Sequence, residues 1–102
     1  MLFRSTYAES QGFAVVRDFC GHGLGRVFHT SPEILHYGTP HTGVELKEGM
    51  FFTIEPMINA GGHQVKVLKD GWTAVTVDRS LSAHFEHTVA ITSKGPEVLT
   101  VF

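Results

Sequence analysis

Polar and apolar residues alternate most regularly in two short segments of the second half of the chain. In "MFFTIE", residues 50–55, alternation places Glu55 beside Thr53 on one face of a strand and Phe52 on the other. Pro56 follows and biases the residue before it towards extended geometry. The segment predicts a strand with one apolar face and a second face that carries a carboxylate.

The segment "HFEHTVAI", residues 84–91, repeats this pattern, with Glu86 beside Thr88 in an otherwise apolar strand. A carboxylate within a core strand is costly unless its charge is compensated, although a strand glutamate more often faces solvent. Basic residues are scarce near both positions: Lys47 is the only one within ten residues of Glu55. A cation other than lysine or arginine is therefore a candidate partner for the two carboxylates.

Turn signals predict two hairpins in the same half of the chain. An Asp-Gly pair separates residues 65–69 from residues 72–77, which is the strongest hairpin signal in the sequence. A Ser-Lys-Gly-Pro stretch separates residues 85–92 from residues 97–101. We therefore expect antiparallel pairing within both hairpins.

The first forty residues combine helical and extended signals. Residues 2–10 have helical spacing and end near Gly12, and residues 14–18 are typical of a short strand. Residues 31–33, Ser-Pro-Glu, resemble a helix N-cap followed by proline, which predicts one or two helical turns before Gly38. The resulting fold class is α+β, a largely antiparallel sheet with an N-terminal helix packed on it.

Composition narrows the function classes. The chain has 102 residues, 42% of them hydrophobic and 18% charged, with a formal net charge of -2 and no basic run. This composition is typical of a single globular domain and argues against nucleic acid or an anionic membrane as a partner. The single cysteine, Cys20, cannot form an intrachain disulfide, and no apolar run approaches the length of a membrane span. A cytoplasmic location is the default expectation.

The stretch "GHGLGRVFH", residues 21–29, holds His22 and His29 among three glycines. One alternative is a flexible loop with two incidental histidines. The other is a loop that glycine allows to pass close to a metal ion, because two carboxylates and one or two imidazoles are suitable ligands for Zn, Mn, Fe or Co. The stretch matches neither a dinucleotide-binding motif nor a P-loop, and a zinc deaminase would need more than one cysteine.

Three strings carry a family resemblance: "CGHGLGRVFHTSPEILHYG", "LKEGMFFTIEPMINAG" and "KDGWTAVTVDRSLSAHFEHTVAIT". In this order and spacing they resemble the C-terminal half of a type I methionine aminopeptidase, a metallopeptidase with the pita-bread fold. Type II enzymes carry a long insertion between the two glutamate motifs, whereas only 30 residues separate Glu55 from Glu86 here. The resemblance implies that residues 1–102 form a single incomplete domain, the C-terminal lobe of a catalytic domain.

The resemblance also implies roles for individual residues. His22, Glu55 and Glu86 would be metal ligands; Glu55 would also contact the attacking water and shuttle its proton, and Glu86 would bridge two metals. Three residues would contact the substrate, an N-terminal methionyl peptide. His29 would be both a catalytic and a substrate-binding residue, because it would hydrogen-bond the scissile carbonyl. Phe28 and Trp72 would bind substrate by placing their aromatic rings around the methionine side chain.

The family's two aspartate ligands and a further histidine come from an N-terminal half that this sequence does not contain. We therefore expect two divalent metals (Co, Mn, Fe or Zn) in the complete enzyme, and at most one, weakly bound, in this chain. The missing N-terminal lobe is the expected partner, and the isolated chain is expected to be an inactive methionyl aminopeptidase fragment. The alternatives are a non-catalytic lobe that binds peptides or a partner, and one chain of a split enzyme.

Overall fold

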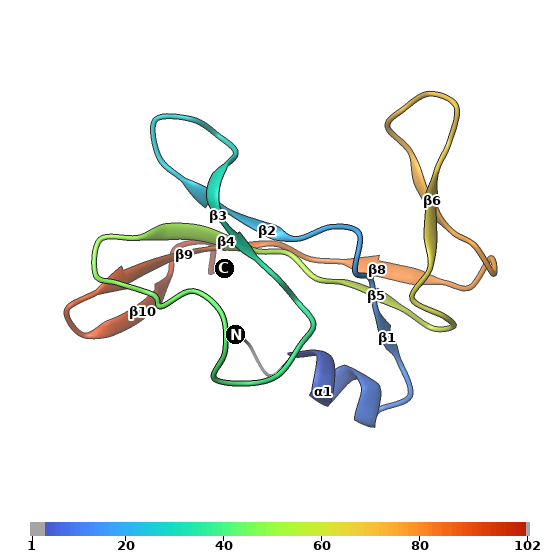
Figure 1. Ribbon diagram of the computed structural model, residues 1–102, viewed down its shortest axis with the longest axis horizontal. Helices are drawn as coiled ribbons and strands as arrows, with labels where there is room; N and C mark the ends of the chain where they lie inside the picture. The colour runs from blue at the N-terminus through green and yellow to red at the C-terminus, as the bar shows by residue number, and fades with distance from the viewer. Residues whose placement is uncertain (1–3, 102) are drawn as a thin grey trace.

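The computed structural model describes residues 4–101, which form one short helix and ten short strands (Figure 1). The helix, α1, spans Arg4–Ser10 and contacts the first strand. The strands are β1 (Ala14–Val15), β2 (Gly21–Leu24), β3 (Thr30–Ile34), β4 (Phe51–Ile54), β5 (Met57–Asn59), β6 (Val65–Val67), β7 (Ala74–Thr76), β8 (Ser82–His84), β9 (His87–Thr92) and β10 (Gly95–Val98). This arrangement confirms the α+β class.

The strands form three antiparallel sheets. The largest has the order β10-β9-β4-β2-β3, the second has the order β1-β5-β8, and β6 pairs with β7 alone. The chain passes from the second sheet to the largest between β1 and β2, leaves the largest sheet between β4 and β5, and returns to it between β8 and β9. The segments β4–β5 and β8–β9 lie side by side, so the two sheets continue one another across the molecule (Figure 1).

The register of the large sheet sorts the side chains into two faces. Phe52 lies opposite Gly23 on β2 and opposite Val89 on β9, and these positions share a face with Ile34 of β3 and Ile54. Ile34, Phe52, Ile54 and Val89 form the buried core cluster. The predicted alternation in "MFFTIE" is thereby confirmed, because the intervening residues occupy the other face.

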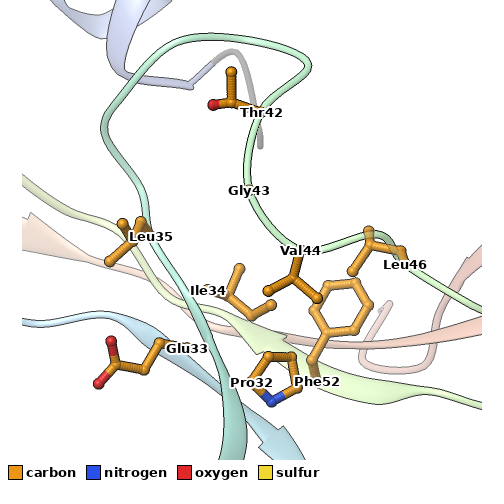
Figure 2. A pocket seen from close by; sticks show the side chains of 9 residues that line it. All are labelled: Pro32, Glu33, Ile34, Leu35, Thr42, Gly43, Val44, Leu46 and Phe52. Atoms are coloured by element: carbon orange, nitrogen blue, oxygen red, sulfur yellow. The ribbon is translucent and has the colours of Figure 1, made fainter.

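An apolar pocket lies on the core face of this sheet, where the segment between β3 and β4 loops over it (Figure 2). Figure 2 shows Ile34, Val44 and Phe52 turned towards one another at its floor. The lining residues are Pro32, Glu33, Ile34, Leu35, Thr42, Gly43, Val44, Leu46 and Phe52. The face that carries Thr53 and the two predicted glutamates is the opposite one.

Both predicted hairpins form, but their strand bounds differ from the prediction. β6 and β7 pair on either side of the Asp-Gly turn, as expected, although they cover only residues 65–67 and 74–76 of the predicted 65–69 and 72–77. In the second hairpin, however, Gly95 already pairs with Thr92, so the turn is shorter and β10 begins two residues earlier than predicted. Pro96 is compatible with this position because β10 is an edge strand, whose outer side needs no N–H donor.

The predicted helical turns after Ser31 are wrong. Residues Thr30–Ile34 form β3, which pairs with β2 at the edge of the large sheet, and the Ser31–Pro32 bond is cis. Pro32 is again tolerated because the strand is an edge strand. Strand pairing therefore prevails over a local capping signal.

The N-terminal elements largely agree with the prediction. The predicted helix is confirmed from Arg4 to Ser10, and its first two residues lie outside the described residues. Gly12 has a φ of 84°, which suits the glycine that ends a helix, and the Phe13 N–H donates to the carbonyl of Ala8. β1 covers only two of the five predicted positions. No helix within residues 4–101 is long and apolar enough to cross a membrane.

A carboxylate holds the loop between β5 and β6 to the segment after β7. Asp78 accepts hydrogen bonds from the Gly62 N–H at 2.7 Å and from the Ser80 N–H at 3.0 Å. The Gly62 bond, followed by those from Ser80, lowers the pKa of the Asp78 carboxyl to about 2. These bonds favour the ionised carboxylate, so ionised Asp78 stabilises the folded chain.

Replacement of Asp78 should therefore have an effect that depends on pH. Because the pKa is lowered in the folded state, the stabilisation is present above about pH 4 and is lost as the pH falls towards about 2. We expect Asp78→Asn to lower the urea midpoint at about pH 6, with a smaller difference at about pH 2.5. Glu97→Gln, which replaces an exposed carboxylate on β10, is the control. A deficit of equal size at both pH values would contradict the assignment.

Candidate metal centre

Three potential metal ligands converge at the point where the two larger sheets meet. His22 lies on β2, Glu55 directly follows β4, and Glu86 directly precedes β9. Each offers a ligand atom within 4.8 Å of the others. Strand pairing explains this convergence: Ile54 lies opposite His87, so the next step of the antiparallel register brings Glu55 opposite Glu86, while β2 approaches β4 from its other side.

The hydrogen bond of His22 decides which ring nitrogen faces the carboxylates. Its Nδ1 lies 3.0 Å from the carbonyl oxygen of Gly23. A carbonyl can only accept, so Nδ1 carries the proton in the neutral ring, and Nε2 presents its lone pair. Nε2 lies 3.5 Å from Oε2 of Glu55. The imidazole therefore has the tautomer that a metal ligand requires.

The electrostatics of this cluster call for a positive charge. Glu55 and Glu86 take opposing positions just beyond the paired ends of β4 and β9, where two carboxylates repel each other, and Nε2 of His22 faces Glu55. Among residues 4–101, no lysine or arginine forms an ion pair with Glu55 or Glu86. One nitrogen and two carboxylate ligands suit a divalent ion such as Zn, Mn, Fe or Co. The residues that are present thus fit a divalent metal.

The cluster is sheltered on one side only. The side chains of His22 and Glu55 are 12% and 18% exposed, whereas Glu86 is exposed. A ligand set of this kind leaves coordination positions for water or for further ligands on the side of Glu86.

Two of the residues expected to bind substrate lie against His22. The ring centroid of His29 is 4.4 Å from that of His22, and the Phe28 ring contacts His29 edge-on at 4.5 Å. Phe28 is also 5.6 Å from His22 and is 70% exposed. The structure therefore brings the imidazole of His29 and an accessible aromatic ring to the edge of the cluster.

Trp72 has a different position. It lies in the turn between β6 and β7, with 89% of its surface exposed, and makes no ring contact with His22 or Phe28 in the described chain. The β2–β3 loop and the β6–β7 hairpin project from the same side of the sheets (Figure 1). Phe28 and Trp72 thus stand on two separate projections above one face.

The glycines around His22 have a packing role that the sequence analysis did not identify. Residues 21–24 form β2 rather than a loop. A Cβ on Gly21 would collide with the carbonyl oxygen of Thr53, and one on Gly23 with that of Ser31, whereas a Cβ on Gly25 would meet open space. Glycine is therefore needed because β2 lies unusually close to both of its neighbours.

Two buried side chains next to the cluster also had no assigned role. Thr53 accepts a hydrogen bond from the His22 N–H at 2.9 Å, and His36 accepts one from the Glu55 N–H at 3.0 Å. Each is 1% exposed. The alternation pattern had placed Thr53 beside Glu55, but no local pattern distinguished His36 from the other histidines.

Cys20 does not show the properties of a nucleophile. Burial, followed by the carboxylates of Glu33 and Glu55, raises the pKa of its thiol, which stays protonated at neutral pH. Its position is consistent with a packing role.

Comparison with known proteins identifies the class to which this site belongs. Residues 3–93 match the sequence model of metallopeptidase family M24, so the chain belongs to this family. A cluster of residues that could hold a metal ion is therefore consistent with membership of a metallopeptidase family.

The similar proteins are methionine aminopeptidases. The chain is 57% identical over 95 residues to the methionine aminopeptidase of Salmonella typhimurium and 56% identical to that of Escherichia coli K12; each alignment covers 93% of this chain and 36% of the relative. The crystal structure of the Rickettsia prowazekii methionine aminopeptidase matches with a TM-score of 0.91 and 57% identity, over 95% of this chain and 40% of that one. The crystal structure of the Thermotoga maritima methionine aminopeptidase matches with a TM-score of 0.91 and 55% identity, and the match covers 97% of this chain and 40% of that chain.

These matches confirm the expected family and the pita-bread fold. The chain spans between about one third and two fifths of the length of these relatives.

The close approach of β2 to its neighbours generates a prediction. Gly23→Ala should force β2 and β3 apart and lower the free energy of unfolding by about 1–3 kcal/mol, the usual cost of overpacking. Gly25→Ala is the matched control, because its Cβ has room, and it should change stability by less than about 0.5 kcal/mol. Urea unfolding of the two variants measures both values, and equal effects would refute the packing role.

Proposed function

We propose that residues 1–102 form one lobe of a metal-dependent aminopeptidase that removes N-terminal methionine from peptides. The observation that carries this proposal is the convergence of His22, Glu55 and Glu86 with the tautomer of His22 that presents Nε2 to the two carboxylates. Membership of the metallopeptidase family and the similarity to methionine aminopeptidases support it.

In this proposal His22 Nε2 and the carboxylates of Glu55 and Glu86 would hold a divalent ion, either Co, Mn, Fe or Zn. When bound, such an ion polarises a carbonyl group and makes water a stronger nucleophile near neutral pH. Glu55 is the better sheltered of the two carboxylates and accepts the proton of the attacking water. Glu86, which is the exposed carboxylate, would be the residue to share a second ion with an adjoining lobe.

The substrate is an N-terminal methionyl peptide. His29, in contact with His22, donates a hydrogen bond to the scissile carbonyl, where negative charge develops. Phe28 and Trp72 provide exposed aromatic surface on the two projections above the site, and aromatic rings make favourable contacts with a thioether. Specificity for methionine is assigned to these two side chains.

The three ligands of this chain are sufficient for one metal and insufficient for two. A two-metal hydrolase holds its ions about 3.5–4 Å apart and needs further ligands on the second ion. We therefore assign those ligands to a separate lobe, and the isolated chain has one weak metal site and no peptidase activity.

Isothermal titration of the 102-residue chain with Co²⁺ tests the metal site. We expect a single site that is lost in His22→Ala, because that variant removes the only nitrogen ligand of the cluster. His41→Ala, which removes an exposed histidine in the segment between β3 and β4, is the control and should bind as the unchanged chain does. Two sites, or binding that is indifferent to His22, would contradict the assignment.

Complementation tests the activity. The metal-loaded chain alone should release no methionine from a methionyl tripeptide, whereas a mixture with the remaining N-terminal segment of the Escherichia coli relative should do so. In that mixture Glu55→Gln should lower kcat by at least about 100-fold, because the proton acceptor is lost. Activity of the chain alone, or full activity with Glu55→Gln, would refute the proposed division of roles. A mixture that binds the tripeptide without hydrolysis would favour the non-catalytic alternative.

A further inference from the structure

The backbone of Glu55 is held by a side chain that lies outside the cluster. β4 ends at Ile54, and the Glu55 N–H donates to Nε2 of His36 at 3.0 Å. For this bond to form, Nε2 must be unprotonated, so His36 is a neutral imidazole with its proton on Nδ1. The His36 residue is 1% exposed, which leaves no open access for a water molecule to take over the role of acceptor.

The neighbouring residue makes this bond more important. Pro56 follows Glu55 and has no N–H, so the next peptide group cannot donate a hydrogen bond. The hydrogen bond to His36 therefore holds the backbone at Glu55, directly after β4, and the peptide group that follows cannot contribute a second one.

The same arrangement occurs on the strand next to it. The ladder between β2 and β4 contains the pairs Gly23 with Phe52 and Leu24 with Phe51. Beyond it, the His22 N–H donates to Oγ1 of Thr53 at 2.9 Å. The backbone N–H groups of His22 and Glu55 thus both donate to side-chain acceptors.

We propose that His36 is a positioning residue of the metal centre, which acts on the metal through the backbone of Glu55 and does not contact the ion. The proposal rests on the proposed function, because it assumes that Glu55 is a ligand. Residues that orient metal ligands typically change the affinity for the metal by about 10–100-fold when they are removed. Loss of the His36 acceptor frees the Glu55 backbone and displaces its carboxylate from His22 and Glu86.

Four variants of the 102-residue chain separate this role from a contribution to stability. His36→Phe keeps a planar ring and removes the acceptor. His36→Gln offers an oxygen at about the reach of Nε2, and His36→Asn offers the same group one carbon shorter. Val16→Ala removes packing from a position that is 2% exposed and directly follows β1, while its backbone N–H still donates to the carbonyl of Met57. Co²⁺ affinity is measured by isothermal titration, and amide hydrogen exchange of Glu55 is measured by NMR.

We expect His36→Phe to raise the Kd for Co²⁺ by about 10–100-fold and to abolish the exchange protection of the Glu55 amide. His36→Gln should recover most of the affinity and His36→Asn should not, so this pair carries the test even where His36→Phe does not fold. Val16→Ala should leave Kd unchanged while lowering the urea midpoint.

Failure of the positioning role and failure of the proposed function give different results. If the unchanged chain and His36→Phe bind Co²⁺ with equal affinity, the positioning role is overturned and the metal centre is not. The positioning role is also overturned if Val16→Ala weakens Co²⁺ binding as much as His36→Phe does. It is overturned as well if His36→Gln and His36→Asn bind Co²⁺ with equal affinity. An unchanged chain that binds no Co²⁺ overturns the metal centre itself, and the positioning role with it.

Discussion

The pairing of β4 with β9 determines where the charge of this molecule is concentrated. The register that places Thr53 opposite Thr88 and Ile54 opposite His87 brings Glu55 opposite Glu86 one step further on. On an ordinary sheet surface such a pair would be unfavourable, because like charges on opposite strand positions repel. Here the same register also packs Phe52 against Val89 on the reverse face, so the core cannot form without bringing the two carboxylates together. Hydrophobic burial therefore holds a charge arrangement that a divalent cation would relieve.

The position of His22, the third proposed ligand, depends on β2, the other neighbour of β4. β2 can deliver His22 to the same face only by lying very close to β3 and β4, and this is possible because Gly21 and Gly23 have no Cβ at the points of contact. The glycines, the carbonyl of Gly23 that orients the imidazole, and the hydroxyl of Thr53 that holds its backbone thus belong to one arrangement. Each acts on His22 from a different direction.

Much of this could be predicted from the sequence, and the exceptions share a physical cause. Alternation identified Glu55 and Glu86 and the face they share, because side-chain direction in a strand follows from local geometry. The family motifs pointed to His22. The Ser-Pro-Glu signal at residues 31–33 failed because β3 gains more from pairing with β2 than a capping residue provides. The role of His36 was not foreseen, because its partner lies 19 residues away and only the folded sheet brings them together. Long-range contacts of this kind leave no periodic signal in the sequence.

The way in which His22, Glu55 and Glu86 are held supports the proposal that this chain has some affinity for a metal on its own. All three ligand-bearing residues are attached to the same pair of sheets, and two of their peptide groups are fixed by buried acceptors. A site held in this way has little to lose in conformational entropy when an ion binds, since the backbone positions are already determined by strand pairing. The open side at Glu86 limits affinity in the opposite sense, because nothing in the described chain excludes water from that carboxylate. The cluster is therefore preorganised on the sheet side and open on the side of Glu86, which is the arrangement that the proposed role as one lobe of a metal centre requires.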